Sequence, residues 1–283
     1  MYFCSEFLTM RNLLPTIVVS LALSFLVQCK SGLVTMSNSC YNMISTGQSQ
    51  NKSGNYSGAL ETFNTVLQKC DAYDSKEKGF AGKAEALNGL KQFNDALAAA
   101  NEGLKISNSS IDNLFQRATA EIGLGMESAA KSDLNTIISL TQKNKNTAER
   151  ATIYAKIAAL NAKEQAYDEA LGNINQAMSL DNSNLDFSVL QGDIYVASGK
   201  FKEGLESYDN AISRGRNDAE VWKAKATALI KMNQKKYGTD NAGSLAKKMN
   251  SAEKQSLCAT IRTAVEHGMK DMNIELMQVA VCN

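Results

Sequence analysis

Six cysteines and a single histidine are the side chains of this chain most capable of covalent or metal chemistry. A structural zinc site draws on closely spaced cysteine pairs or on several histidines. The chain contains no Cys-x-x-Cys sequence, and His267 is its only histidine, so we expect neither a bound metal nor a cofactor. The cysteines are expected to form disulfides or to carry a covalent modification, with free buried thiols as the alternative.

Cys29 follows an apolar run, residues 13–27, that contains no charged side chain and is preceded by Arg11. The run is short for a membrane span of about 20 residues but suits the core of a signal peptide. The sequence Leu26-Val27-Gln28-Cys29 resembles a lipobox, where the signal is removed and the cysteine thiol takes a diacylglycerol. Gln28 departs from the usual Gly, Ala or Ser at that position.

We therefore predict a signal peptide over residues 1–29, lipidation of Cys29, and a Ser- and Gly-containing tether over 30–39. The true start is either Met1 or Met10. The alternatives are an ordinary secreted protein that is cut nearby and an uncleaved anchor.

The charge balance excludes one large class of partner. The chain has 30 basic and 29 acidic residues and a formal net charge of +1. A nucleic-acid phosphate backbone is recognised by a strongly basic surface, so nucleic acid is not an expected partner. The only proline is Pro15, and alanine, leucine, lysine and glutamate are plentiful, which favours helix nearly everywhere.

Small residues recur in the chain at a period near 34, with intervals of 37, 34, 40, 34 and 34 residues. Two antiparallel helices that pack closely need alanine or glycine where their backbones approach. In four of five cases an aromatic residue precedes the small residue of the next helix by three positions, where it fills the gap between helix pairs. The recurring small residues are Gly47, Ala84, Ala118, Ala158, Gly192 and Ala226, and the aromatics are Tyr56, Phe93, Tyr167 and Phe201.

Several of these segments resemble the tetratricopeptide repeat (TPR) family. The stretch from Gly199-Lys200-Phe201 to Asn210-Ala211-Ile212 is similar to the family's second helix, and Val221-Trp222-Lys223-Ala224-Lys225-Ala226 is similar to the opening of its first. Gly54-Asn55-Tyr56-Ser57-Gly58-Ala59-Leu60 matches as well. Glu127 replaces the aromatic in the third repeat, and the family's proline after each second helix is absent throughout.

The resemblance implies an all-α fold, a right-handed helical-repeat solenoid of about six helix pairs. We expect the repeats over 40–245, with a sixth that begins well but has an altered second helix. A helical cap is expected over 246–283, with one helix that begins at a Ser251 cap and stops at Gly268, and a second from about Lys270 to Val281.

Four cysteines remain after Cys4 and Cys29 are set aside, and they allow three pairings. Cys40 opens the first helix of the first repeat and Cys70 closes its second, so the two lie side by side in an antiparallel pair. Cys258 and Cys282 are related in the same way in the cap. We predict the bridges Cys40–Cys70 and Cys258–Cys282, the second of which resembles the disulfide-closed cap of some secreted bacterial helical-repeat proteins.

In TPR proteins the first helices line a concave groove that often holds an extended peptide or a partner's helix. Carried over, this implies a groove that is apolar to mildly acidic and lacks the lysines and asparagines that clamp a terminal carboxylate. A hydrophobic partner segment with some basic character would suit it. The inward positions are Glu85, Asn88, Phe115, Thr119, Ile122, Val189, Asp193, Val196, Thr227 and Ile230.

We expect an exported, non-catalytic scaffold that binds other proteins of the bacterial cell envelope, held by its lipid anchor at the outer membrane facing the periplasm. One alternative is a subunit of an outer-membrane assembly or secretion complex. Another is a receptor lipoprotein for a soluble ligand or glycan, which would need aromatic platforms for sugar stacking. The only tryptophan, Trp222, occupies a repeat-core position, which counts against that alternative.

Overall fold

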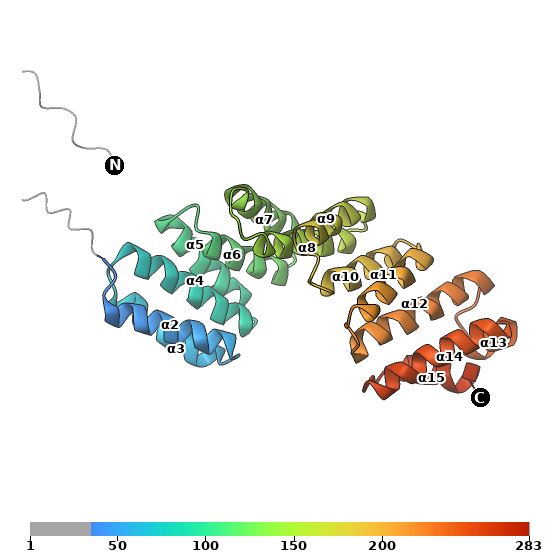
Figure 1. Cartoon of the computed structure of the whole chain (residues 1–283). Helices are drawn as coiled ribbons and strands as arrows, with labels where there is room; N and C mark the ends of the chain where they lie inside the picture. The colour runs from blue at the N-terminus through green and yellow to red at the C-terminus, as the bar shows by residue number, and fades with distance from the viewer. Residues whose placement is uncertain (1–34, 283) are drawn as a thin grey trace, which may run out of the picture.

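The computed structural model describes residues 35–282, so the predicted signal peptide, Cys29 and most of the tether lie outside the described residues. The described part of the chain is all α-helical, as predicted. Five antiparallel helix pairs follow one another along the chain and stack side by side into an arch (Figure 1). The pairs are α2 (Asn38–Lys52) with α3 (Tyr56–Lys69), α4 (Tyr73–Gly89) with α5 (Phe93–Ile106), α6 (Ile111–Gly123) with α7 (Glu127–Thr141), α8 (Ala148–Lys163) with α9 (Tyr167–Leu180), and α10 (Asp186–Ala197) with α11 (Phe201–Ser213).

The aromatic residues that begin the second helices occupy the gaps between pairs, as the repeat pattern predicted. The Tyr56 ring lies directly over Gly89 of the following first helix, and a methyl group on that glycine would be 2.4 Å from the ring. Phe93 lies over Gly123 in the same way, at 2.5 Å. The first two repeats therefore bury these aromatic rings only when the next repeat is present, which couples neighbouring repeats.

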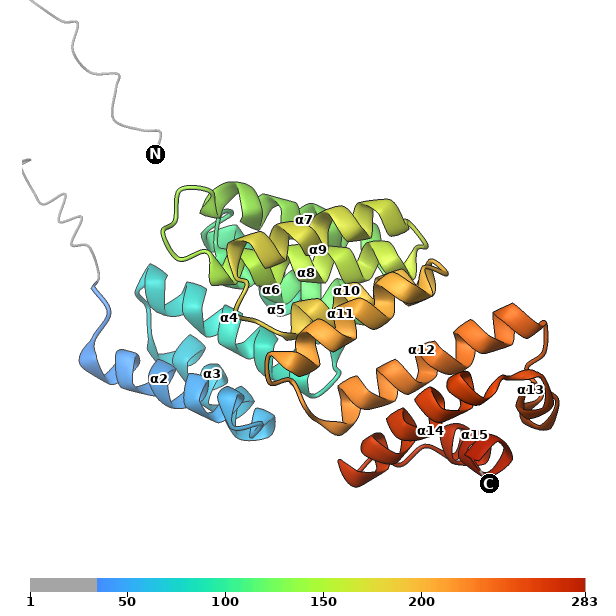
Figure 2. The same ribbon diagram turned by 45° about the vertical axis from the view of Figure 1, so that its right-hand side comes forward.

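The sixth pair is built differently from the first five. Helix α12 (Ala219–Tyr237) is followed by α13 (Ala242–Lys248), which is only seven residues long, and α12 packs instead along α14 (Ser251–Glu266) (Figure 2). Helix α15 (Met272–Cys282) completes the carboxy-terminal end. The largest hydrophobic cluster extends from α12 through α15, so the cap closes the core of the last repeat.

Two disulfides lie at the two ends of the described chain. Cys40 and Cys70 are bonded with their Cα atoms 6.0 Å apart, and Cys258 and Cys282 with theirs 5.6 Å apart. These are the two pairings expected from the sequence. The first bridge joins the start of α2 to the residue after α3, and the second joins the interior of α14 to the end of α15. The terminal helices therefore cannot separate while the bonds are intact.

The cap helix α14 begins one residue earlier than the sequence pattern suggested. Asn250, rather than Ser251, is its N-cap. The Asn250 side chain accepts from the Glu253 backbone N–H at 2.9 Å, and the Glu253 carboxylate accepts from the Asn250 backbone N–H at 2.9 Å. This reciprocal capping box satisfies two backbone donors, one more than the side chain of a cap residue satisfies alone. The helix ends as expected at Gly268, whose φ of +90° lies in the left-handed region.

Candidate partner-binding groove

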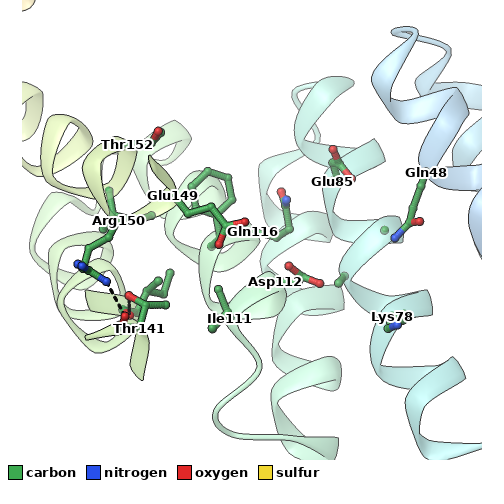
Figure 3. A pocket seen from close by; sticks show the side chains of 15 residues that line it. Gln48, Lys78, Glu85, Ile111, Asp112, Gln116, Thr141, Glu149, Arg150 and Thr152 are labelled. Carbon is green, nitrogen blue, oxygen red and sulfur yellow. Dashed lines mark hydrogen bonds between the residues drawn. The ribbon is translucent and has the colours of Figure 1, made fainter. Parts of the chain in front are cut away.

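A cavity of about 370 Å³ lies on the first helices, between α2, α4, α6 and the start of α8, with the end of α7 at its base. Figure 3 shows the polar side chains of α2, α4 and α6 on one side and those of α8 on the other. A cavity of this size suits a few side chains of a peptide. Its lining includes Gln48, Lys78, Glu85, Asp112, Phe115, Gln116 and Arg150.

The charged groups of this cavity are not equivalent. The Glu85 carboxylate accepts from the Asn51 amide at 3.0 Å, but its burial and the neighbouring Asp112 raise its pKa above the usual value. The Arg150 guanidinium is already engaged, because it donates to the Thr141 carbonyl. Lys78 is solvent-exposed. The cavity is therefore apolar at Phe115 and acidic at Glu85 and Asp112.

The ten residues expected to line one groove are distributed over two hollows and the surface between them. Glu85 and Phe115 border the cavity described above. Asp193, Val196 and Thr227 border a second hollow of about 440 Å³ between α10, α11 and α12. The half-buried Asn88, Thr119 and Ile122 lie on α4 and α6 and line neither hollow.

Two of the expected groove residues contribute mainly to packing. Val189 and Ile230 are each only 9% exposed and belong to hydrophobic clusters between helices. Their small exposed surfaces leave little for a partner to contact. Partner binding by the whole set stays a prediction, and we expect the exposed members of the set to carry it.

The second hollow has a polar character of its own. The Tyr208 hydroxyl donates to the Asp193 carboxylate at 2.7 Å. Desolvation of that carboxylate raises the pKa of Asp193, while the hydrogen bond from Tyr208 opposes the rise. Because Tyr208 is itself almost fully buried, this hydrogen bond positions Asp193 from the core side and leaves the face of the hollow to Thr227 and the exposed lysines Lys223 and Lys231.

Sequence reasoning missed one residue on these helices. The Lys156 ammonium of α8 lies over the Phe115 ring of α6, 5.1 Å from its centroid. Burial lowers its pKa below the ordinary lysine value. Its position in the repeat corresponds to Gln116 in the repeat before it, forty residues earlier, and that correspondence was the available signal. The set of positions expected from the sequence contains no lysine, whereas the structure places Lys78 in the cavity lining and Lys156 beside it.

Residues 35–282 contain no group of three or more His, Cys, Asp or Glu side chains placed to hold a metal ion. Over the same residues no helix is both long and apolar enough to cross a bilayer. His267 lies at the end of α14, and its Nδ1 is 2.8 Å from the Thr263 carbonyl oxygen. Trp222 is half-buried between α12 and the cap, with its ring centroid 6.2 Å from that of His267.

Comparison with known proteins gives a consistent family and fold. Residues 39–234 match the family of the tetratricopeptide repeat-like domain. A TPR protein from Parabacteroides merdae aligns over 100% of its own chain and 87% of this one, at 15% identity and a TM-score of 0.57. The pilF protein of Pseudomonas aeruginosa aligns over 96% of its chain and 85% of this one, at 12% identity and a TM-score of 0.62.

YrrB, a TPR protein with an unusual peptide-binding site, aligns over 99% of its chain and 78% of this one, at 14% identity and a TM-score of 0.51. At these identities the likenesses show the shared fold alone. No curated protein matches the chain.

Proposed function

Because the chain belongs to the tetratricopeptide repeat-like family, we propose that it is an exported, lipid-anchored scaffold that binds a segment of another cell-envelope protein on its first helices. The scaffold carries no catalytic activity of its own. The single observation that carries this proposal is the cavity between α4, α6 and α8, which combines an apolar wall at Phe115 with hydrogen-bonding and charged groups around it. Recognition of a peptide needs both kinds of group.

Two features support export. The apolar run that ends before Cys29 has the length of a signal-peptide core. The four cysteines after it are joined in two disulfides, a state typical of proteins in oxidising compartments. Eight residues, 30–37, lie between Cys29 and the start of α2, so an acylated Cys29 would hold the first repeat within roughly 30 Å of the membrane surface.

The binding proposal is tested by site-specific photo-crosslinking in the producing cells. A photoreactive residue replaces Thr119, on the first-helix surface, or Asn135, an exposed residue of the second helix α7. We expect one discrete adduct from position 119 and none from position 135, and we expect Phe115→Leu to weaken the adduct. Equal labelling at both positions, or no adduct at position 119, contradicts the proposal.

The anchor is tested separately by metabolic labelling with a radioactive fatty acid. Cys29→Ser is expected to abolish the label and to release the protein from the membrane fraction, because the thiol is the acylated atom. Cys4→Ser serves as the matched control and is expected to leave the label unchanged. Labelling that persists in Cys29→Ser would overturn the lipoprotein assignment and leave the binding proposal intact.

A further inference from the structure

Neighbouring first helices in the amino-terminal repeats are joined by amide hydrogen bonds. The Asn88 side-chain amide of α4 donates to the Gln116 carbonyl of α6 at 2.9 Å and to the Gln116 side chain at 3.1 Å. At the junction before it, the Asn51 amide of α2 donates to the Gly82 carbonyl of α4 at 3.0 Å. These half-buried and buried bonds hold the first helices at a fixed separation.

The junction between α6 and α8 lacks this hydrogen bond. The repeat places Ile122 where α4 has Asn88, and it places Lys156 where α6 has Gln116. An isoleucine side chain offers an ammonium group no acceptor. The Lys156 amine lies instead over the Phe115 ring. This cation–π contact is weaker than an ion pair with a carboxylate.

Two further features separate α8 from α6. The ring of Phe93 covers Gly123 at the preceding junction, whereas the corresponding residues at this one, Glu127 and Lys163, form a partly exposed ion pair. The loop from α7 to α8, residues 142–147, is also the longest connection between the five pairs. The space that results contains the cavity bordered by Phe115.

Lys156 is left without an anionic partner in this space. Among residues 35–282 its amine makes no ion pair and no hydrogen bond, although the residue is half-buried. Burial alone accounts for the lowered pKa, with no nearby carboxylate to oppose it. A desolvated cation without a counter-ion destabilises the free protein, and an incoming carboxylate relieves that cost.

We propose that the α6–α8 junction binds an aspartate or glutamate side chain of the partner segment at Lys156, with an apolar side chain of the same segment against Phe115. This inference rests on the proposed function and names the chemistry of the partner at that site. Lys156 lies beside the cavity, over the Phe115 ring that borders it, and does not line the cavity itself. Glu85, Asp112 and Glu149 do line it and repel a carboxylate there. Lys78 is exposed and hydrated, so pairing with it gains little.

The proposal revises the partner chemistry expected from sequence. A segment with basic character matches Glu85 and Asp112 but leaves Lys156 unpaired. A segment that carries both an acidic residue for Lys156 and a basic residue toward Glu85 satisfies both ends of the site. The acidic residue is the part that the structure adds, because the unpaired lysine is visible only once α6 and α8 are placed together.

The probe for this inference is a phage-displayed library of random twelve-residue peptides, selected against the full chain purified in detergent. Selections on Lys156→Met, Lys156→Arg and Phe115→Leu run in parallel. Lys202→Met, which removes an exposed lysine of the second helix α11, is the matched control. Thermal unfolding followed by circular dichroism verifies that each variant is folded before selection.

We expect the wild-type chain, Lys156→Arg and Lys202→Met to enrich peptides with Asp or Glu beside an apolar residue, and Lys156→Met to lose the acidic preference. For one selected peptide, Asp→Asn should weaken binding about tenfold on the wild-type chain and leave binding to Lys156→Met unchanged. Peptides that need Phe115 but show no acidic preference, or that bind Lys156→Met equally well, would overturn this inference alone. Failure to select any peptide that depends on Phe115 would overturn the proposed function as well.

Discussion

The α4–α6 and α6–α8 junctions join equivalent helices of successive repeats in different ways. At the first, Asn88 and Gln116 form an amide hydrogen bond and Phe93 covers Gly123. At the second, no hydrogen bond joins the two first helices among the described residues, and a lysine lies over a phenylalanine. A chain can thus keep the repeat period while changing the chemistry of the contact between successive first helices, and the α6–α8 contact is the one that we propose as a partner site.

The missing hydrogen bond between α6 and α8 is not caused by weak packing within the third repeat, α6 and α7. Arg117 of α6 donates from Nε and Nη2 to the Asp133 carboxylate of α7, at 2.6 and 2.7 Å. A bidentate pair of this kind is among the stronger polar contacts in proteins. In a repeat array the stability is the sum of contributions from each repeat and each interface, so a firm third pair offsets a loose interface beside it.

The largest expected effect comes from removing the disulfide of the first helix pair, α2 and α3. The double variant Cys40→Ser, Cys70→Ser should lose roughly 3–4 kcal/mol of stability, because the bridge closes a loop of about 30 residues. Hydrogen exchange should show a loss of protection in α2–α6 and little change in α10–α15. The reason is that the α6–α8 junction couples the stabilities of the repeats on its two sides only weakly. Cys258→Ser, Cys282→Ser should give the reverse pattern. Equal loss along the whole chain in either variant would show that the α6–α8 junction is as tightly coupled as the others.

Two glycine substitutions measure how closely α4 packs against the second helix before it, α3. Gly82 occupies in α4 the position that Lys156 occupies in α8, and a methyl group there would lie 2.1 Å from the fully buried Phe63 ring. Gly82→Ala should therefore cost about 1–3 kcal/mol in urea unfolding. Gly172→Ala, in α9 with no atom near the added methyl group, should instead stabilise the chain by about 0.5–1 kcal/mol. The same sign for both substitutions would contradict the close packing of α4.

The smallest effects should have opposite signs at the two junctions. Asn88→Leu removes two hydrogen bonds and should lower the stability by about 1–2 kcal/mol. Lys156→Met removes an unpaired, half-buried charge and should leave the stability unchanged or raise it by up to about 1 kcal/mol. Thermal unfolding of both variants measures the difference. A Lys156→Met variant as destabilised as Asn88→Leu would mean that the lysine holds the junction together.

The repeat pattern was sufficient to predict the fold because its cause is local and periodic. Small residues at a period near 34, and aromatics such as Tyr56 and Phe93 at a constant offset, dictate helix pairs that bury their faces only by stacking. The cysteine pairing followed from the same pattern, since antiparallel helices bring Cys40 to Cys70. The sixth repeat was less predictable, because nothing local indicates that α12 packs on α14 and bypasses the short α13.

The candidate site was only partly predictable from the sequence. Glu85 and Phe115 face the cavity, as the family's inward positions implied. Val189 and Ile230 occupy equivalent inward positions but are buried, because the degree of exposure depends on how far neighbouring pairs are rotated and separated. A repeat pattern specifies which face of a helix points inward, but it does not specify that separation.

The sequence by itself determined the solenoid of helix pairs, the pairing of the cysteines at its two ends, and which face of each helix points inward. These features depend on periodicity and on residue size. Only the tertiary structure decided where the stack opens. The opening at α6–α8 depends on the loop 142–147 and on Glu127, Ile122 and Lys156 acting together. These residues are far apart in the sequence, and each is unremarkable alone. Their joint effect is to leave one lysine over one phenylalanine without a counter-ion, and packing between repeats determines that outcome.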